Sequence, residues 1–340
     1  MTKHPIHRYI HIRPKKNPSL KDLYKVIQKD LDKTEEKLKS FTDSSNEIIS
    51  EINTYLFQNT GKRIRPALLM LCSKLLGYKG DKHIFLSSLI ETLHTASLIH
   101  DDIIDNSELR RGRKTVHTKW GPNITVLLGD YLYVKTLGLF IKNTHREIAQ
   151  ILIDTSAKMI EGELYEYQMS GKLDIKEKDY LEVIRKKTAS LFAASCQIGG
   201  ILAGASEKEK KLLARFGANL GMSFQIIDDL LDYIGDEKTL GKPILSDLNE
   251  RRITLPLIYT LNNRTSDRTR IIELMSQKNL DKESKIEILD LIKSNGALDY
   301  TRKKAEEFSL KSKKIMNGFS ESKYRDTLFL ILDYIVNRDR

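Results

Sequence analysis

The chain has 340 residues, of which 40% are hydrophobic and 30% are charged. This composition supplies enough apolar side chains for a sizeable core and carries too much charge for a bundle of membrane-spanning helices. No run of 18 uncharged apolar residues occurs, so we expect no membrane span. The N-terminal residues lack the apolar stretch of a secretory signal. Cys72 and Cys196 lie in apolar surroundings that predict buried, reduced thiols, and we expect a cytoplasmic protein.

The net charge of +11 is distributed unevenly along the chain. Six lysines and arginines and no acid occur in the first 21 residues, so the remainder is only mildly basic. A modest excess of cations suits an anionic substrate or membrane surface, and it differs from the concentrated basic stripe of a nucleic-acid-binding protein. We expect residues 1–19 to be a basic flexible extension, for which contact with anionic lipid is a hypothesis, and residues 20–340 to form one domain.

Helical periodicity dominates the sequence from residue 65 onwards, with apolar residues recurring at spacings of three and four. No proline occurs between residues 123 and 242, which permits several long helices, and no convincing strand pattern is present. The pattern predicts an all-α, single-domain antiparallel helical bundle. The predicted helical segments are 65–76, 83–100, 124–141, 147–169, 178–203 and 207–233, with breaks near 77–80, 121–122, 170–171, 204–205 and 235–236.

Two aspartate clusters with the spacing D-D-x-x-D, at 101–105 and 228–232, each follow a long apolar helical run. Asp101 and Asp105 are four residues apart and share one helix face, with Asp102 turned away by about a quarter turn. Carboxylates so placed repel one another and face the negative end of the helix dipole. A divalent cation would remove this conflict, and oxygen ligands completed by water and phosphate are typical of magnesium.

One such cluster alone is more often a solvated acidic turn than a metal site. Two copies with the same spacing, both directly after apolar helices, instead favour a magnesium–diphosphate site. Basic groups that could contact phosphate oxygens are distributed around the clusters. They occupy 61–66 (GKRIRP), 110–113 (RRGR), 185–188 (RKKT) and 241–243 (GKP). The first group does not complete a phosphate-binding P-loop, and no strand precedes it.

These motifs resemble those of the trans-prenyl diphosphate synthases, also called the polyprenyl synthetase family, from about residue 20 to at least residue 310. The matching stretches are GKRIRP (61–66), HTASLIHDDIIDNSELRRG (94–112), GDYLY (129–133), MIEGEL (159–164), KTASLF (187–192), FQIIDDLLD (224–232) and LGKPILSDL (240–248). The resemblance implies an all-α bundle around a deep central cavity, usually homodimeric. It also implies an enzyme that joins isopentenyl diphosphate to an allylic diphosphate and releases pyrophosphate.

The resemblance also implies a role for each matching residue. Asp101 and Asp105 would bind two magnesium ions and Asp228 a third, while Asp102, Asp229 and Asp232 would orient those ligands. Isopentenyl diphosphate would contact Lys62, Arg65, His94 and Arg111. The allylic diphosphate would contact Arg110, Lys187 and Lys242, and Thr188 and Gln225 would stabilise the developing allylic cation.

The sequence departs from the family pattern in the stretch DLNERRITLP. Family members commonly carry Gly-Lys where this chain has Arg251-Arg252. Arg252 keeps a cation at the position of the lysine, whereas Arg251 replaces the glycine and leaves the conformation of that loop undetermined.

Product length is expected to depend on the residues one helical turn before Asp101. They are small, Ala96 and Ser97, whereas short-chain members of the family often place a bulky aromatic residue there. The first cluster also lacks a two-residue insertion common in bacterial short-chain enzymes. Both features favour a long-chain product, although the two small residues could instead serve close helix packing. A deeper floor would then lie near Leu89, Leu93, Leu128 or Leu132.

Three alternatives stay open at this point. The enzyme could make a short-chain farnesyl or geranylgeranyl product, or it could be the catalytic subunit of a heteromeric synthase. A class I terpene cyclase shares the fold and one aspartate-rich motif, but the second D-D-x-x-D and GKRIRP argue against it.

Overall fold

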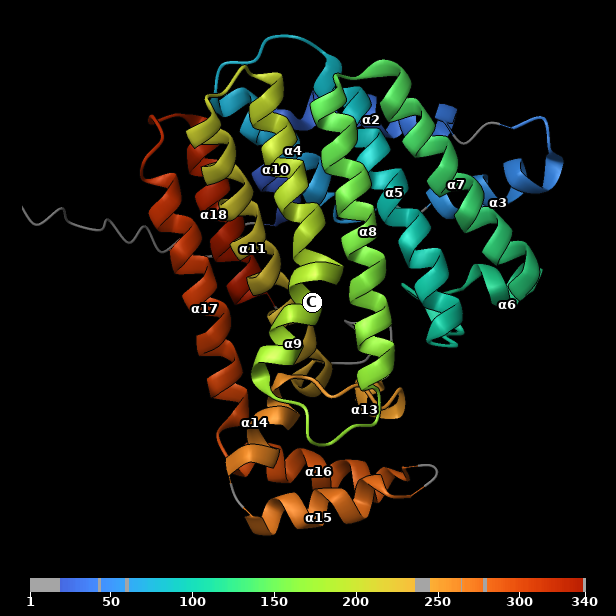
Figure 1. Cartoon of the computed structure of the whole chain (residues 1–340), viewed down its shortest axis with the longest axis vertical. Helices are drawn as coiled ribbons and strands as arrows, with labels where there is room; N and C mark the ends of the chain where they lie inside the picture. Colours follow the sequence, from blue (N-terminus) through green and yellow to red (C-terminus); the bar gives the residue numbers. More distant parts are fainter. Residues whose placement is uncertain are drawn as a thin grey trace, which may run out of the picture.

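The computed structural model of the chain describes residues 19–41, 44–58, 61–235, 245–263, 265–277 and 280–338. Residues 1–18 of the predicted extension and the predicted ligand Lys242 lie outside this part of the chain. The longer helices run mostly along the long axis of the molecule (Figure 1). They are α2 (Gln28–Phe41), α3 (Glu47–Phe57), α4 (Ile64–Leu75), α5 (Lys82–Ile104), α7 (Pro122–Asn143), α8 (Arg146–Met169), α10 (Ser190–Leu202), α11 (Glu207–Ile234), α17 (Ala297–Met316) and α18 (Lys323–Asn337).

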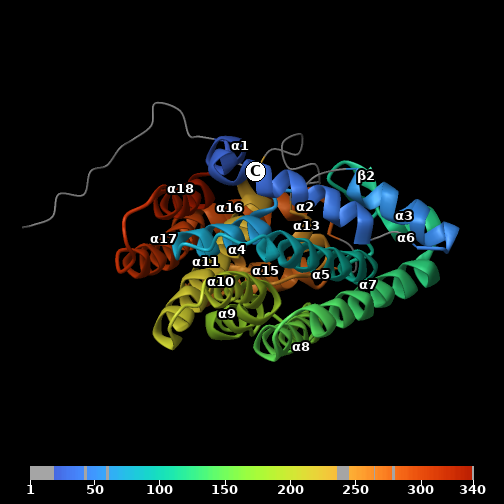
Figure 2. The ribbon, with the colours of Figure 1, turned by 90° about the horizontal axis from the view of Figure 1, so that it is seen from above.

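Shorter elements connect and close this bundle. They are α1 (Leu20–Leu23), the 3₁₀ helix η1 (Tyr24–Ile27), α6 (Val116–Trp120), α9 (Glu177–Ile184), the π-helical turn η2 (Arg185–Ala189), α13 (Ser246–Asn249), α14 (Leu255–Asn263), α15 (Thr265–Met275) and α16 (Lys282–Ser294). In Figure 1, α15 and α16 lie across the lower end of the long helices. Viewed from above, α2 lies over α4 and α5, on the side away from α8, α9 and α10 (Figure 2).

The all-α bundle predicted from periodicity is confirmed. Each predicted break coincides with the end of a described helix, from the α4–α5 turn to the end of α11 at Ile234. The predicted segment 178–203 is helical throughout, but its middle widens into the π turn η2 between α9 and α10. Helix α11 packs against α10 and α17, α10 packs against α4, and α5 packs against α7.

The two helices that carry the aspartate clusters end where the clusters do. Helix α5 ends at Ile104 with Asp105 as its C-cap, and α11 ends two residues after Asp232. Helix α11 begins with a capping box, in which the backbone N–H of Ser206 donates to Glu209 at 2.8 Å and Glu209 N–H donates to the Ser206 hydroxyl at 3.3 Å. Both clusters therefore lie at helix C-terminal ends, as the apolar runs before them predict.

A short hairpin follows α5 and was not predicted from the sequence. Its strands, β1 (Leu109–Arg110) and β2 (Arg113–Lys114), pair antiparallel and have two residues each, too few to show an alternating pattern. The turn residues Arg111 and Gly112 both have positive φ, at 53° and 73°. This is the backbone of a tight two-residue hairpin, which matches the twist of its strands. The hairpin carries two arginines of the predicted phosphate site back beneath α5.

Helix α7 differs from the other long helices in how little of it is covered. It alone among the described helices is long and apolar enough, by length and composition, to cross a membrane, with a mean hydropathy of 1.5 and only 33% of that stretch buried. One side packs on α5 through Leu128 and Leu132, while Leu127 and Val134 are exposed. Cys72 and Cys196, in contrast, are fully buried, as predicted.

Candidate active site

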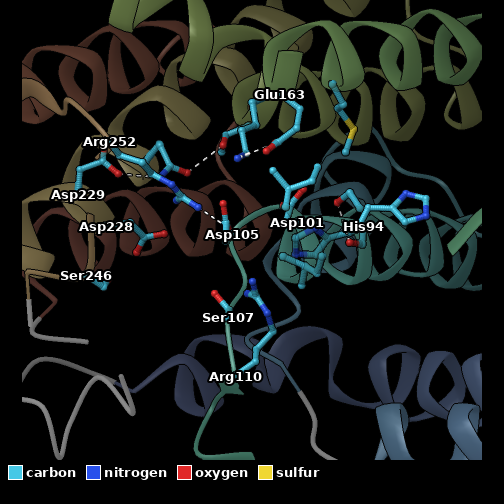
Figure 3. A pocket seen from close by; sticks show the side chains of 18 of the residues that line it. His94, Asp101, Asp105, Ser107, Arg110, Glu163, Asp228, Asp229, Ser246 and Arg252 are labelled. Atoms are coloured by element: carbon cyan, nitrogen blue, oxygen red, sulfur yellow. Dashed lines mark hydrogen bonds and ion pairs between the residues drawn. The ribbon is translucent and has the colours of Figure 1, made fainter. Parts of the chain in front are cut away.

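A cavity of about 850 Å³ lies among the ends of α5 and α11, the middle of α8, the turn η2, the hairpin and residues 246–252 (Figure 3). Most of the residues predicted to act together meet in it, although they come from widely separated parts of the chain. The cavity-lining residues that were predicted are Lys62, Arg65, His94, Ser97, Asp101, Asp105, Arg110, Arg111, Lys187, Thr188, Gln225, Asp228, Asp229 and Arg252.

Residues with left-handed backbone also gather around this cavity. Among the described residues, five that are not glycine have positive φ: Arg63, Asn106, Arg111, Leu245 and Arg251. Two of them line the cavity, and the other three directly precede residues that line it. Left-handed backbone costs a side-chain-bearing residue about 1–2 kcal/mol, and such strain tends to concentrate at functional sites.

In the first cluster, Asp101 and Asp105 face the cavity, while the middle aspartate, Asp102, bonds to the hairpin. Asp101 and Asp105 line the cavity, and Asp105 forms an ion pair with Arg252 from across it. Asp102 accepts a hydrogen bond from Nε of Arg110 at 2.5 Å. Burial raises the pKa of both Asp101 and Asp102. Asp101 also faces the like charge of Asp105, so a cation bound between these carboxylates would relieve both penalties.

The second cluster has the same spacing but different partners. Asp228 lines the cavity and accepts from Arg338 at 2.5 Å; Arg338 also donates to the carbonyl of Phe224 at 2.9 Å. Asp232 does not line the cavity. It accepts from the Ser246 hydroxyl at 2.7 Å and from Asp247 N–H at 3.0 Å, and so holds the start of α13.

Asp229 ends a chain of hydrogen bonds that orders the cavity wall. Thr188 donates to Gln225 at 2.8 Å, the Gln225 amide donates to Asp229 at 2.8 Å, and Tyr180 donates to the other Asp229 oxygen at 2.6 Å. Because the amide nitrogen is used by Asp229, the Gln225 oxygen is oriented toward Thr188. Burial raises the pKa of Asp229 to about 6. The two residues predicted to stabilise an allylic cation are thus directly bonded to each other.

The π turn η2 positions Lys187 against α8. The Lys187 ammonium lies 2.6 Å from Glu163 and 2.5 Å from Glu166. Burial by itself would lower the pKa of Lys187, but Glu166, Asp101 and Glu163 outweigh it and raise that pKa. The backbone approach requires Gly162, because a Cβ there would lie 2.4 Å from the Lys187 nitrogen. Short π segments of this kind recur at functional sites.

Another part of the cavity wall is strongly cationic, and we call it the cationic wall. Arg65 donates to His94 at 3.0 Å, and its guanidinium lies 4.5 Å from the centre of the Phe192 ring. The pKa of His94 is far below its usual value because of burial and the nearby arginines, so its ring is neutral and accepts this bond. Burial lowers the pKa of Arg65 to about 10 and also lowers that of Arg111. Nε of Arg65 is buried without a hydrogen-bond partner. This wall is therefore suited to an anion that completes its hydrogen bonds.

Arg63 holds the loop that presents Lys62 and Arg65. Its backbone is left-handed, and its guanidinium donates to Glu35 at 2.5 and 3.0 Å and to Glu91 at 2.6 Å. These bonds join α2 and α5 to the start of α4. Two residues earlier, a Cβ at Gly61 would lie 2.8 Å from the Arg111 guanidinium, so any larger residue there would displace the end of that side chain.

Three predicted residues are placed differently from the rest. Asp232 supports a turn, Lys242 lies outside the described residues, and Ala96 is buried against Leu128 and Leu132 rather than on the cavity wall. Sequence reasoning missed Arg338, Glu163 and Glu166. Glu163 lies within the MIEGEL motif, next to Gly162, and Glu166 follows four residues after that glycine, so both could have been found as acids of this motif. Nothing in the sequence indicates that Arg338 reaches Asp228.

The carboxylates fit a magnesium ion that is shared with a substrate. The donors that line the cavity are oxygens of Asp101, Asp105 and Asp228, which are ligands that magnesium prefers. Within the described residues, no three side chains of His, Cys, Asp or Glu converge closely enough to enclose an ion by themselves. Magnesium typically completes such a partial site with water and substrate phosphate.

Known proteins are similar to this chain in both sequence and fold. A family model described as Polyprenyl synthetase matches residues 46–292. Octaprenyl diphosphate synthase of Escherichia coli is 34% identical over 298 residues, which cover 88% of this chain and 92% of the relative. Geranylgeranyl diphosphate synthase of Sulfolobus acidocaldarius is 37% identical over 279 residues (80% and 84%). Heptaprenyl diphosphate synthase component 2 of Geobacillus stearothermophilus is 34% identical over 320 residues (94% and 99%).

A solved structure extends the likeness to three dimensions. The polyprenyl synthase of Caulobacter crescentus, solved with calcium and isoprenyl diphosphate, superposes with a TM-score of 0.91 at 31% identity and covers 96% of this chain and 100% of that one. With the paired aspartate clusters and the cationic wall in one cavity, these matches show that the chain belongs to the polyprenyl synthetase family and is a prenyltransferase, a prenyl diphosphate synthase.

Proposed function

We propose that this enzyme carries out repeated magnesium-dependent condensation of isopentenyl diphosphate with an allylic diphosphate, and that its main product is a long-chain polyprenyl diphosphate. The observation that carries the reaction is that one cavity is lined both by the aspartates and by Arg65, His94 and Arg111. Two diphosphates can bind there at once, one on each wall.

The acidic wall is suited to the allylic diphosphate. Asp101, Asp105 and Asp228 would hold up to three magnesium ions, which neutralise charge on the leaving diphosphate when bound. Arg110 and Lys187 add fixed cations at this wall, and Lys242 is proposed to join them. The Gln225 oxygen and the Thr188 hydroxyl place partial negative charge beside the carbon that becomes cationic.

The cationic wall is suited to isopentenyl diphosphate. Desolvation lowers the pKa of Arg65 and of Arg111, so a bound diphosphate would stabilise the charged form of both side chains. Lys62 lines the same wall, and neutral His94 fixes Arg65 in place. A substrate held by these groups lies in the same cavity as the allylic carbon. The two reactants are then held together before they react, so the condensation becomes effectively unimolecular.

The proposal of a long product rests on the wall beneath Asp101. Ser97 lines the cavity there, and its hydroxyl donates to the His94 carbonyl at 2.8 Å, so it presents little bulk to a growing chain. The test is to incubate the purified chain with magnesium, farnesyl diphosphate and radiolabelled isopentenyl diphosphate and to chromatograph the dephosphorylated products. Products of six or more isoprene units support the proposal, and a main product of three or four units supports the short-chain alternative.

Substitutions at Ala96 and Ser97 distinguish a residue that lines the cavity from one that only packs between helices. Ser97→Phe should shorten the product while sparing the first condensation, because the ring enters the cavity. Ala96→Phe should mainly destabilise the fold by overpacking against Leu128 and Leu132, at a cost of about 1–3 kcal/mol. Equal shortening by both variants would place both residues on the wall; no shortening by Ser97→Phe would contradict the proposed wall.

We propose further that the active form is a homodimer formed through α7 and α8. Each helix exposes apolar residues seven positions apart, and therefore on one face. On α7 these are Leu127, Val134 and Ile141, which are 68%, 73% and 60% exposed. On α8 they are Ile153, Ile160 and Tyr167, of which Tyr167 is 71% exposed. A second copy of this face would cover both stripes, which are otherwise unusually apolar for a surface.

Light scattering on the eluting protein tests this assembly. The unmodified chain should have twice its monomer mass of 39.1 kDa, and a Val134→Glu, Ile160→Glu double variant should be monomeric. Leu310→Glu, at a 55% exposed position on α17, is the matched control and should stay dimeric. A monomeric unmodified chain that is inactive alone would favour the heteromeric alternative, because the Geobacillus stearothermophilus relative is named as one component of a synthase.

The terpene cyclase alternative and the role of the basic extension each have a direct test. Cyclic hydrocarbon formed from an allylic diphosphate without isopentenyl diphosphate would favour the cyclase alternative. Contact of the basic extension with anionic lipid predicts that deleting residues 1–18 weakens co-sedimentation with anionic liposomes, and unchanged co-sedimentation would refute it.

A further inference from the structure

The GDYLY motif lies on α7, the helix that packs along α5 beside the first aspartate cluster (Figure 1). Three of its five residues surround one side chain of α5, that of His100: they are Gly129, Asp130 and Tyr133. This histidine directly precedes Asp101, and both residues line the active-site cavity. The motif therefore meets the proposed metal site at a single ring.

The His100 ring is held by α7 both at its edge and on its face. Its Nε2 lies 3.2 Å from the carbonyl oxygen of Val126 and 3.6 Å from a carboxylate oxygen of Asp130. Both of these oxygens only accept hydrogen bonds, so Nε2 carries a hydrogen and donates it to the Val126 carbonyl. The ring is also stacked on Tyr133, with centroids 5.9 Å apart and planes 14° from parallel. These contacts fix both the position and the plane of the ring.

Gly129 provides the space that this ring occupies. A Cβ at that position would lie 2.1 Å from Nε2 of His100, and 2.5 and 2.7 Å from its Cδ2 and Cε1. Glycine destabilises the interior of a helix relative to alanine, and Gly129 lies inside α7. The glycine is thus suited to letting the histidine approach α7 closely, and any side chain there would push the ring away.

The end of α5 needs an anchor because its last turn carries carboxylates that repel one another. Burial, and to a smaller extent the like charge of Asp105, raises the pKa of Asp101. On one side this turn is bonded to the hairpin, through Asp102 and Arg110. Successive side chains on a helix are about 100° apart, so His100 and Asp102 leave α5 on either side of Asp101. Together the two anchors set the rotation of the last turn, and with it the direction in which Asp101 points.

Packing alone does not account for a histidine at this position. One turn earlier, the contact between α5 and α7 is apolar and buried, with Ala96 against Leu128 and Leu132. The His100 side chain is instead 27% exposed and reaches the cavity. An apolar residue would fill the space equally well, whereas a ring bonded to a backbone carbonyl also specifies an orientation.

We propose that His100 is a positioning residue for the metal-binding aspartates. Its bond to α7, which Gly129 makes possible, sets the direction of Asp101 and thereby the affinity of the acidic wall for magnesium and diphosphate. This inference rests on the proposed magnesium-dependent reaction. Replacing a residue that orients a metal ligand typically changes metal affinity or activity by about ten- to a hundredfold.

Three variants separate the contributions to this contact. His100→Phe keeps a ring against Tyr133 but removes the hydrogen-bond donor, and His100→Gln restores an N–H donor at the end of the side chain. Gly129→Ala leaves the histidine in the sequence but displaces its ring. Gly138→Ala is the matched control on α7, because an added Cβ there would meet no other described atom within 4 Å. Circular dichroism and light scattering on each protein show whether the fold or the assembly has changed.

Calorimetry with inorganic pyrophosphate measures magnesium-dependent binding at the acidic wall without turnover. His100→Phe and Gly129→Ala should weaken this binding by about tenfold or more, and should raise the magnesium concentration that gives half-maximal activity. His100→Gln should stay within about threefold of the unmodified chain, and Gly138→Ala should equal it. The KM for isopentenyl diphosphate should change by less than about twofold in all four variants, because this substrate is proposed to bind at the cationic wall.

Unchanged pyrophosphate binding in folded His100→Phe and Gly129→Ala proteins would overturn the inference alone. A glutamine variant as weak as the phenylalanine variant would also overturn it, because the donated hydrogen bond would then have no role. An equal loss in the KM for isopentenyl diphosphate would assign His100 to packing and overturn it as well. An unmodified chain without magnesium-dependent binding of pyrophosphate would overturn the proposed function, and the inference with it.

Discussion

The two aspartate clusters have the same five-residue spacing and the same place at a helix end, yet the chain uses their members differently. In the first, the third aspartate, Asp105, lines the cavity and pairs with Arg252. In the second, the third aspartate, Asp232, turns away and holds Ser246 and Asp247. The difference follows from where the chain goes next. After α5 it forms a hairpin that leaves Asp105 facing the cavity, whereas residues 245–247 return and pack onto Asp232.

The middle aspartates differ in the same way. Asp102 is bound by Arg110 from the hairpin, whereas Asp229 is fixed by Tyr180 on α9 and by Gln225, one turn earlier on its own helix α11. A repeated motif thus identifies a metal–diphosphate site, but the surrounding chain decides which carboxylate binds, which orients and which supports.

The largest effect is expected at Asp101. Asp101→Asn removes a charge from the centre of the acidic wall, and kcat/KM should fall about a thousandfold at saturating magnesium. Circular dichroism should be unchanged, because burial already penalises the charged carboxylate. Asp154→Asn, on the exposed face of α8, is the control. A loss smaller than tenfold would show that Asp101 does not bind the metal.

Replacing Asp105 or Asp232, the third aspartate of each cluster, by asparagine tests directly whether the two clusters differ. Asp105→Asn should lower kcat/KM about a hundredfold with little change in stability, because this carboxylate faces the cavity. Asp232→Asn should lower the free energy of unfolding by about 1–3 kcal/mol, because it weakens two buried hydrogen bonds, and should lower activity less. Steady-state kinetics and denaturant unfolding give kcat/KM and the free energy of unfolding for each of the two variants. Matching profiles for the two variants would mean that the clusters are equivalent.

A smaller effect is expected at Arg252, the partner of Asp105. Arg252→Lys restores the residue usual in the family and should keep activity within about threefold, since one cation still faces Asp105. Arg252→Ala should cost about tenfold or more in kcat, with greater sensitivity to magnesium concentration. Magnesium titrations of the three proteins provide the measurement. An alanine variant as active as the lysine variant would remove this cation from the site.

The smallest effect is expected next to it, at Arg251. Its φ of 55° is left-handed, and its guanidinium donates to the Gln277 carbonyl at 2.8 Å. Arg251→Gly and Arg251→Ala both lose this exposed bond, but only glycine accepts the backbone without strain. The glycine variant should therefore be more stable than the alanine variant by about 1 kcal/mol. Equal midpoints in denaturant would show that the loop relaxes when the side chain is removed.

Arg251 also shows what the sequence could and could not predict. Replacement of the usual glycine left the loop conformation undetermined, yet the structure keeps the left-handed backbone and bears its strain. Helices, their breaks and the two clusters were predictable because periodicity and spacing are local properties. The partners of Asp232 and Asp228 were not, because they depend on chain segments that return from 14 and 110 residues away.

Glu163 and the hairpin were missed for related reasons. Glu163 has a pKa raised to about 7 by burial, a property that exists only once α8 packs on η2. The hairpin strands are too short to show a pattern, and their turn uses Arg111 at a position where glycine or asparagine would have given a signal. Ala96 was predicted on the cavity wall from its distance to Asp101, but side chains one position apart on a helix point in different directions, and only Ser97 faces inward.

The π turn η2 limits the sequence changes that this protein can tolerate. A π turn holds one residue more than an α turn, so deleting a single residue from Arg185–Ala189 would restore regular helix pairing. It would also rotate α9 relative to α10 by about 100°, carrying Tyr180 away from Asp229. The length of this segment is therefore constrained as well as its composition. A substitution there can have a small or a large effect. An insertion or deletion would instead separate Lys187 and Thr188 from the helices that carry their bonding partners.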